Sequence, residues 1–459
     1  MATQSIASKL ASIPGTPPGP KGLPLIGVAS DVLKDPLGFF MGTFEEYGDV
    51  ARFHVGNKQF IMLNHPDHVQ YVLQGNHTNY HKGPNYKNLR PFLGNGLVTS
   101  ESPFWLRQRR LIQPAFHRKR LGNFALVMAE SAQEMLDRWQ PYSQNGQAFN
   151  IADEFMRVTL QVVSRAMFST GTDGFADVIG QNLPVVLERT NERFWEIFDT
   201  SGLPTAANRR YWQAIQALDS VVYRVIDERR KNPEKPDDLL TMLLEAIDEE
   251  SGEQMTDQQL RDEVMTIFLA GHETTANALS WTYTLLAGHP EIAGKLRTEV
   301  DVVLQGRRPV FEDLPNLKYT RMVIDEVLRL YPSVWAIART PIQPDEVGGY
   351  RLDPGVNVAI TPYITHRHPA FWDNPEEFDP ERFSPERSAG RHPFAYFPFG
   401  GGPRLCIGNN FALTEATLIL AMITQRYELE LLPDQKIVMQ PVVTLRPRDG
   451  IRMRVHPRK

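Results

Sequence analysis

The segment FPFGGGPRLCIG, residues 397–408, holds the only cysteine in a chain of 459 residues. A lone cysteine is most often a small buried hydrophobe. Cys406, however, follows a glycine run and precedes an apolar stretch, residues 407–423, that predicts a helix. A helix N-terminus and a neighbouring arginine, here Arg404, both favour the thiolate form of a cysteine. Cys406 is therefore a candidate nucleophile, redox sensor or metal ligand.

A single cysteine limits the kinds of site that the chain can build. It excludes a disulfide within the chain and any zinc or iron–sulfur site made from several thiolates. A haem iron needs only one protein ligand on its proximal side, and the glycines at 400–402 beside Phe399 suggest room for a large planar group. The nucleophile of a hydrolase would also need a histidine base within reach. We therefore favour a haem thiolate and keep the hydrolase as an alternative.

The composition is that of a globular protein, with 42% hydrophobic and 22% charged residues. The net charge of -5 provides no basic field for nucleic acid. The N-terminus lacks a continuous apolar core typical of a signal sequence, and no window is apolar enough for a transmembrane anchor. We expect a cytoplasmic protein with a Pro-rich lead-in over residues 1–24 and one large catalytic domain over residues 25–459.

Apolar spacing predicts helices through most of residues 100–335. Alternating residues and turn signals predict three β-hairpins, which turn at Gly56–Asn57, at Asp353–Gly355 and at Asp449–Gly450. No internal repeat or long flexible linker divides the chain. The pattern indicates a mainly α fold with small β-sheets.

One predicted helix is unusually long and runs from Thr256 to Ala287. Thr256 and Gln259 can form a capping box, and Gly288 and Pro290 suit its C-terminal end. Its centre, residues 270–275, holds a glycine and two adjacent threonines that are poor helix formers. Small residues there would let a cofactor approach the helix, beside an acid and a hydroxyl. The alternative is a packing contact with a surface glutamate.

These residues together resemble the motifs of the cytochrome P450 family. Phe399, Gly402, Cys406 and Gly408 match its haem-binding signature, F-x-x-G-x-x-x-C-x-G. Further segments are similar to its other motifs and occur in the family's order: Trp105-x-x-x-Arg109, Ala270-Gly271-x-Glu273-Thr274, Glu326-x-x-Arg329 and Glu381-Arg382-Phe383.

The resemblance implies the cytochrome P450 fold, a single large domain with a long central helix over the haem. It implies a haem-thiolate monooxygenase that uses haem b, iron protoporphyrin IX, to insert one atom of O2 into an apolar substrate, such as a fatty acid or another lipophilic small molecule. Electrons would come from an external ferredoxin, flavodoxin-type protein or flavoprotein reductase. A haem-thiolate gas or ligand sensor without turnover is the alternative.

The resemblance also assigns roles to individual residues. Cys406 would bind the iron, and Glu273 and Thr274 would be the catalytic pair that delivers protons. The residues implied in haem binding are Trp105, Arg109, Ala270, Arg339, Phe399, Arg404, Cys406 and Gly408. A structural ion-pair network that supports the cysteine loop would consist of Glu326, Arg329 and Arg382. The candidate substrate pocket is formed by Ile267, Val334, Trp335 and Ala336, although Trp335 could equally be a core residue.

The segment 107–122 is locally basic within an acidic chain. We expect its cationic residues to attract an acidic redox partner: Arg107, Arg110, Arg118, Lys119 and Arg120. The alternative is a solvated surface without a partner.

Overall fold

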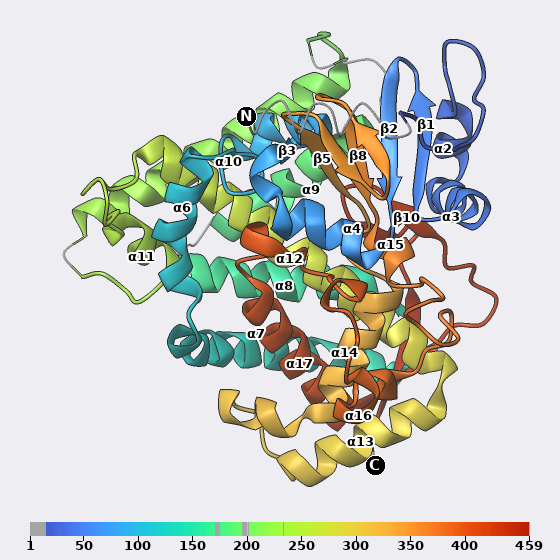
Figure 1. The fold of residues 1–459 in the computed structure, drawn as a ribbon. Helices are drawn as coiled ribbons and strands as arrows, with labels where there is room; N and C mark the ends of the chain where they lie inside the picture. Colours follow the sequence, from blue (N-terminus) through green and yellow to red (C-terminus); the bar gives the residue numbers. More distant parts are fainter. Residues whose placement is uncertain (1–14, 170–174, 195–199, 201, 233, 459) are drawn as a thin grey trace. The chain divides into compact units, whose positions relative to one another are not determined.

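The computed structural model describes residues 15–169, 175–194, 200, 202–232 and 234–458. Helices dominate it and the sheets are small (Figure 1), which confirms the predicted fold class. The chain forms two compact units. Unit 1 contains Met1–Lys87, Arg329–Glu377 and Ser388–Cys406, and unit 2 contains Asn88–Leu328, Phe378–Arg387 and Ile407–Lys459.

Unit 1 is built on a five-stranded sheet with the order β1-β2-β8-β5-β3. Its strands are β1 (Val50–Val55), β2 (Lys58–Leu63), β3 (Tyr80–Lys82), β5 (Ile337–Pro341) and β8 (Asn357–Ile360). Strands β2 and β8 run parallel, and the other pairs are antiparallel. A smaller sheet pairs β6 (Asp345–Val347) with β7 (Tyr350–Leu352). The helices of this unit are α2 (Ala29–Lys34), α3 (Pro36–Tyr47), α4 (Pro66–Gln70) and α15 (Pro362–Thr365).

The core of unit 1 connects this sheet to the cysteine loop. Buried residues of β2, β5 and β8 pack with Leu73, Phe394 and Phe397 in one hydrophobic cluster. Phe397 is the first residue of the signature segment, so the loop that carries Cys406 begins inside this core.

Unit 2 is mainly helical. Its principal helices are α5 (Arg90–Leu93), α6 (Phe104–Ile112), α7 (Arg118–Asn145), α8 (Ile151–Phe168), α9 (Phe175–Phe194), α10 (Ala206–Lys231), α11 (Leu239–Glu245), α12 (Asp257–Gly288), α13 (Pro290–Leu304) and α17 (Asn409–Arg426). Helix α14 (Lys318–Leu330) begins in this unit. One sheet has the order β4-β12-β9, from β4 (Phe149–Asn150), β9 (Tyr427–Leu431) and β12 (Arg452–Pro457). A second sheet pairs β10 (Met439–Pro441) with β11 (Leu445–Pro447).

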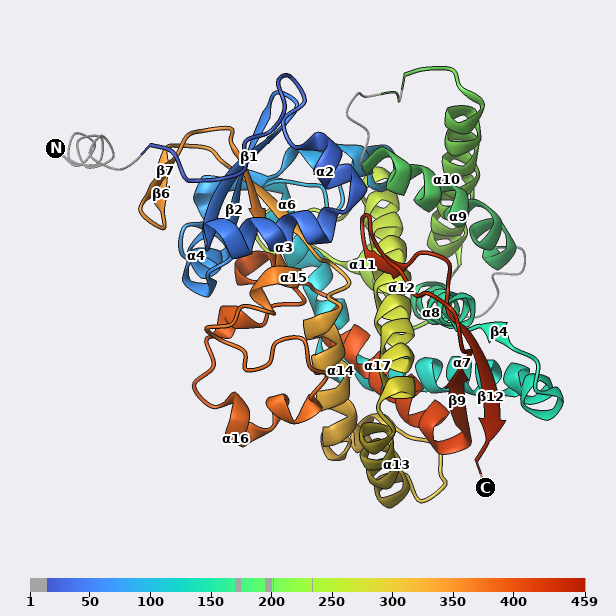
Figure 2. The same ribbon diagram turned by 90° about the vertical axis from the view of Figure 1, so that its right-hand side faces the viewer.

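Helix α12 is the predicted long helix. The capping box between Thr256 and Gln259 is present, and the helix ends at Gly288, just before α13 begins at Pro290. Helix α8 lies alongside α12, and α10 and α17 also contact it (Figure 2). Because most of its side chains are buried on every face, α12 is a core helix rather than an amphipathic surface helix.

The structure confirms one predicted hairpin and contradicts two. Strands β1 and β2 pair around Gly56, which has the positive φ that this turn requires. The turn at Asp353–Gly355 instead joins β7 to β8, which belong to different sheets. The turn at Asp449–Gly450 likewise joins β11 to β12, which pair with β10 and with β9 and β4. Local alternation predicted these strands but not their partners, because pairing depends on distant segments.

Within the described ranges, no helix combines the length and the apolar character that crossing a bilayer requires.

Candidate active site

The signature segment forms a tight loop in unit 1. The Cys406 N–H donates to the Phe399 carbonyl at 2.9 Å, and the Gly400 N–H donates to the Phe397 carbonyl at 2.9 Å. Between them lies a 3-10 turn over Gly402–Arg404, closed by the Leu405 N–H on the Gly402 carbonyl at 3.0 Å. Cys406 is exposed at the end of this loop and forms no disulfide. The backbone bonds therefore fix the position of an accessible sulfur.

Two of the three loop glycines are required by close contacts within the protein. Gly402 has φ +65, and a Cβ there would lie 2.0 Å from the Leu73 carbonyl oxygen. A Cβ on Gly401 would lie 2.3 Å from the Phe394 ring. Only Gly400 of these three meets nothing closer than 3.9 Å, although its φ of +72 still favours glycine. At Gly401 and Gly402, close packing within the protein is therefore itself a reason for glycine, and room for a planar group beside the loop stays a prediction.

Arg329 is wholly buried in unit 1 and reinforces the loop indirectly. Its guanidinium donates to the carbonyls of His366, Pro375 and Glu377 at 2.9, 2.6 and 3.0 Å. His366 is also buried, and its Nε2 accepts the Phe397 N–H at 2.9 Å. A chain of hydrogen bonds therefore runs from Arg329 through His366 to the start of the cysteine loop.

The other two residues of the expected ion-pair network meet in unit 2. Arg382 Nε lies 3.3 Å from Glu326 Oε1, and the same oxygen accepts the Asp379 N–H at 2.9 Å. Both Arg382 and Glu326 are buried. Removing one partner of such a pair leaves a buried charge without compensation, which costs about 3–5 kcal/mol.

The remaining unit 1 candidates lie on β5, just before it, or in the cysteine loop. Arg339 is a buried residue of β5 whose Nη1 donates to the Ala338 carbonyl at 3.0 Å, and Arg404 and Phe399 are half-buried in the loop itself. Trp335 is buried with its ring 5.7 Å from that of Phe40, which supports the core role left open by the sequence. Val334 is exposed and Ala336 is half-buried.

The centre of α12 in unit 2 has an unusual exposure pattern. Ala270 is exposed although residues 260–269 are all buried. Gly271 lets α8 approach, because a Cβ there would lie 3.0 Å from Val163. The Thr274 hydroxyl donates to the Ala270 carbonyl at 2.7 Å, as expected for a threonine inside a helix. The opening predicted beside the helix is therefore at Ala270, whereas Gly271 serves helix packing.

Glu273 points away from this exposed patch into protein. It is only 1% exposed. Its Oε1 accepts the Thr444 hydroxyl at 2.7 Å, and its Oε2 is buried without a hydrogen-bond partner among the described residues. This burial contradicts the alternative of a surface glutamate. Ile267, on the same helix, is buried as well.

Trp105 and Arg109 lie on α6 in unit 2. The Trp105 side chain is buried, and the Arg109 guanidinium lies 5.8 Å from the centre of its ring. The two residues are one helical turn apart and share a face of α6. Gly408 is the N-cap residue of α17, and a Cβ there would lie 3.9 Å from Phe116.

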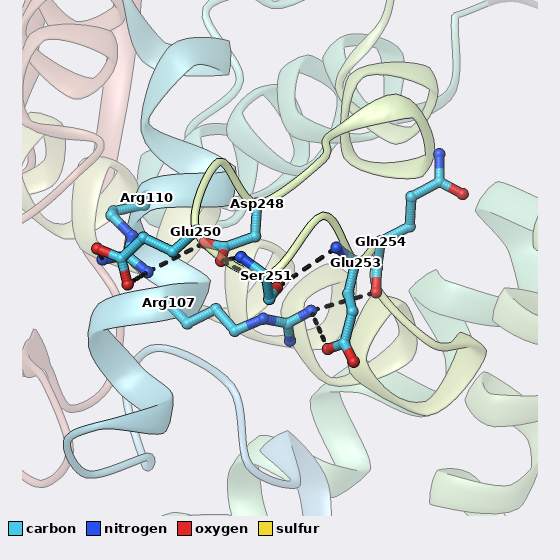
Figure 3. Close-up of polar contacts among 7 residues, drawn as sticks. All are labelled: Arg107, Arg110, Asp248, Glu250, Ser251, Glu253 and Gln254. Atoms are coloured by element: carbon cyan, nitrogen blue, oxygen red, sulfur yellow. Dashed lines mark hydrogen bonds and ion pairs between the residues drawn. The ribbon is translucent and has the colours of Figure 1, made fainter.

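Two arginines of the basic segment after Trp105 pair with an acidic turn of unit 2, which precedes α12 (Figure 3). Arg110 binds Glu250 through both guanidinium nitrogens, at 2.5 and 2.9 Å, and Asp248 at 3.1 Å. Arg107 lies 3.2 Å from Glu253.

Farther along the basic segment, Arg120 pairs with Asp237. Arg118 and Lys119 are exposed, and neither pairs with a carboxylate in the described part of the chain. Three of the five expected docking cations are thus already paired, which the local sequence could not show.

The candidates therefore fall into two groups, each organised within its own unit. Unit 1 holds Cys406 with Phe399, Arg404, Arg339 and Arg329, whereas unit 2 holds Glu273 and Thr274 with Ala270, Trp105, Arg109, Glu326 and Arg382. We did not predict His366 or Thr444 as part of the site. Neither belongs to a motif we used, and each contacts a residue far away in the chain.

Comparison with known proteins identifies the family. The Cytochrome P450 family model matches residues 17–453. Cyclooctatin synthase of Streptomyces melanosporofaciens is 39% identical over 93% of this chain and 92% of its own length. Pentalenene oxygenase of Streptomyces avermitilis is 33% identical over 97% of this chain and 98% of its own length. The crystal structure of the cytochrome P450DA heme domain matches with a TM-score of 0.90 and 32% identity, over 97% of this chain and 98% of that one.

The chain belongs to the cytochrome P450 family. Its residues fit the haem of that family, because Cys406 offers one exposed thiol on a loop fixed by backbone hydrogen bonds. No cluster of three or more histidine, cysteine or acidic side chains in the described ranges offers a different metal site. The protein is a cytochrome P450 monooxygenase. The sensor and hydrolase alternatives are therefore rejected.

Proposed function

We propose that this monooxygenase hydroxylates an apolar terpenoid with O2, haem b and electrons from a separate donor. The relatives reported above are named for cyclooctatin and pentalenene, and homologues of this kind oxidise terpenoids. Those names favour a terpenoid over the fatty acid that the sequence suggested. The observation that carries the proposal is the exposed Cys406 thiol, held on its loop in a chain that matches the family almost end to end.

Haem binding would use the residues that match the family's motifs. Cys406 would bind the iron as thiolate, and the arginines Arg109, Arg339 and Arg404 would bind the propionates, since a guanidinium forms paired hydrogen bonds with a carboxylate. Trp105 would pack beside Arg109, and Phe399, Gly408 and Ala270 would contact the porphyrin. The thiolate-bound haem, once reduced, supplies the activation of O2.

Glu273 and Thr274 would deliver protons to the reaction. Glu273 can take up a proton on Oε2, because Oε1 is already engaged by the Thr444 hydroxyl. Releasing that proton returns Glu273 to the carboxylate form. Thr274 would orient the acceptor of the proton through its hydroxyl, which meanwhile donates to the Ala270 carbonyl. A buried acid beside a partly exposed hydroxyl suits proton transfer into a site that limits water.

Substrate binding would use apolar side chains of α12 and of the segment before β5. Ile267 and Ala270 lie on α12, and Val334 and Ala336 lie just before β5. Trp335 would support this surface from the core through its contact with Phe40. An apolar lining with few polar groups suits a hydrocarbon-rich ligand.

The electron donor would be an acidic ferredoxin, flavodoxin-type protein or flavoprotein reductase. Arg118 and Lys119, which pair with no carboxylate in the described ranges, are the cations best suited to attract it. A single cysteine, which cannot form a disulfide within the chain, also suits a reducing compartment, so we place this reaction in the cytoplasm.

Spectroscopy and turnover together test this proposal. The purified protein, reduced under carbon monoxide, should give the strongly red-shifted Soret band of a thiolate-bound haem. A panel of terpenoids and fatty acids should then be screened for displacement of the iron-bound water. Oxygen-dependent hydroxylation of a terpenoid that binds in this screen would support the function. A nitrogen-bound iron spectrum would contradict it, and turnover of fatty acids alone would contradict the substrate class.

A further inference from the structure

The loop between β10 and β11 is attached to one face of α12. The Thr444 hydroxyl donates to Glu273 Oε1 at 2.7 Å, and Asn277 Nδ2 donates to the Thr444 oxygen at 3.1 Å. One turn farther along the helix, Trp281 Nε1 donates to the Leu445 carbonyl at 3.1 Å. Residues 273, 277 and 281 follow one another at helical spacing, so they form a single row along α12.

The direction of these hydrogen bonds makes Thr444 an acceptor toward Asn277 and a donor toward Glu273. An amide nitrogen can only donate, so Asn277 occupies a lone pair of the Thr444 oxygen. The Thr444 hydroxyl proton is then free to point at Glu273 Oε1. Glu273, Asn277 and Thr444 are all at least 96% buried, so water does not compete for these bonds.

The two carboxylate oxygens of Glu273 therefore have different roles. Oε1 is held as an acceptor by Thr444, whereas Oε2 is buried and has no hydrogen-bond partner among the described residues. Oε2 is the atom left to gain and lose a proton. Without the Thr444 hydroxyl, either oxygen could take the proton and the carboxylate could rotate.

We propose that Thr444, oriented by Asn277, is the positioning residue that holds the Glu273 carboxylate for proton delivery through Oε2. This inference rests on the proposed function, in which Glu273 is the proton donor. It adds a hydroxyl from the C-terminal part of the chain to the acid and threonine of the central helix.

Thr444→Val tests the proposal, because valine keeps the shape of the side chain and removes the hydroxyl. Thr282→Val is the matched control, since Thr282 is also buried and, among the described residues, donates its hydroxyl to the Ala278 carbonyl of its own helix at 2.8 Å. In the holoenzyme with a bound substrate, Thr444→Val should increase the share of O2 released as peroxide by about three- to tenfold, as expected for one lost hydrogen bond. The solvent isotope effect on turnover should change in parallel, and Thr444→Ser should restore both values.

A second measurement does not depend on turnover. Hydrogen exchange of the backbone amides in residues 439–447 should accelerate about three- to tenfold in Thr444→Val and in Glu273→Met, which each remove one partner of the hydrogen bond, with little further increase in the double variant. If Thr444→Val does not yield holoenzyme, Asn277→Ala should shift peroxide release and exchange in the same direction.

The possible results separate the inference from the function on which it rests. If Glu273→Gln releases no more of the O2 as peroxide than the parent protein does, the proton-delivery role itself is contradicted. If Glu273→Gln releases more peroxide but Thr444→Val is indistinguishable from Thr282→Val, only the role of Thr444 is overturned. A Thr444→Ser variant that does not restore the parent share of peroxide would also overturn it.

Discussion

Arg329 donates to the backbone carbonyl of His366 at 2.9 Å, and both residues are fully buried in unit 1. The imidazole of the same His366 accepts the N–H of Phe397. The arginine of the E-x-x-R motif thus reaches the cysteine loop through one histidine. This connection explains how a residue far from Cys406 in sequence supports the thiolate loop.

His366→Ala should weaken the cysteine loop. It leaves the buried Phe397 N–H without its acceptor, which costs about 1–3 kcal/mol of the free energy of unfolding. We expect a lower thermal midpoint and partial loss of the thiolate carbon monoxide spectrum. His392→Ala is the control, because His392 Nδ1 also accepts an N–H, from Phe394 at 3.0 Å, but its side chain is 22% exposed. Equal effects of the two variants would contradict the special role of His366.

Gly402→Ala should be far more damaging than Gly408→Ala, although both glycines match the family signature. A Cβ at Gly402 would overlap the Leu73 carbonyl, and its φ of +65 is itself unfavourable for alanine by about 1–2 kcal/mol. A Cβ at Gly408 would meet only Phe116, at an ordinary contact distance of 3.9 Å. Thermal unfolding of the two variants measures the difference. A destabilised Gly408→Ala beside a normal Gly402→Ala would refute this packing argument.

Glu415→Gln should change how stability depends on pH. Glu415 lies on α17 with no exposed surface, and burial raises its pKa well above the usual range, with the Thr275 hydroxyl offsetting part of the effect. The folded protein therefore keeps this proton to a higher pH than the unfolded chain does. Its stabilising contribution is complete below the unfolded pKa and is lost as pH rises toward the folded pKa, by at most about 1.4 kcal/mol per pH unit.

Glutamine has no proton to lose, so Glu415→Gln should gain stability relative to the parent protein as pH rises from acidic to neutral. Urea unfolding across this pH range measures the effect. Parallel stability curves for the two proteins would show that Glu415 is not held in its neutral form.

Glu250→Gln should speed reduction by an acidic ferredoxin at low ionic strength. The change removes one of the two carboxylates that pair with Arg110 (Figure 3) and leaves only Asp248 to balance its charge, so the surface offered to the partner is more positive. We expect a rate increase of about two- to fivefold that disappears at high salt, because exposed ion pairs are weak and screened. Glu249→Gln removes the same charge from the same turn, and exposed Glu249 pairs with no arginine in the described ranges. Equal rates in the two variants would mean that net charge alone matters.

The fold class could be predicted from the sequence, and so could the ends of the long helix and a buried pair between Glu326 and Arg382. The signature around Cys406 and the start and stop signals of the long helix depend on residues close together in the chain. The structure contains the predicted capping box and ends α12 as predicted. The buried pair of Glu326 and Arg382 also follows the motif-based expectation. Local composition is sufficient where the physical cause is local, as it is for turns, caps and a thiol that is unique in the chain.

Only the tertiary structure decided the partners of these residues. It placed Thr444 on Glu273 and His366 on Phe397, it paired Arg107 and Arg110 with an acidic turn, and it separated two predicted hairpins into different sheets. Each of these contacts joins segments that are distant in sequence, so no local pattern encodes it. Such contacts arise because buried polar groups must find hydrogen-bond partners wherever the packing of helices and strands brings them.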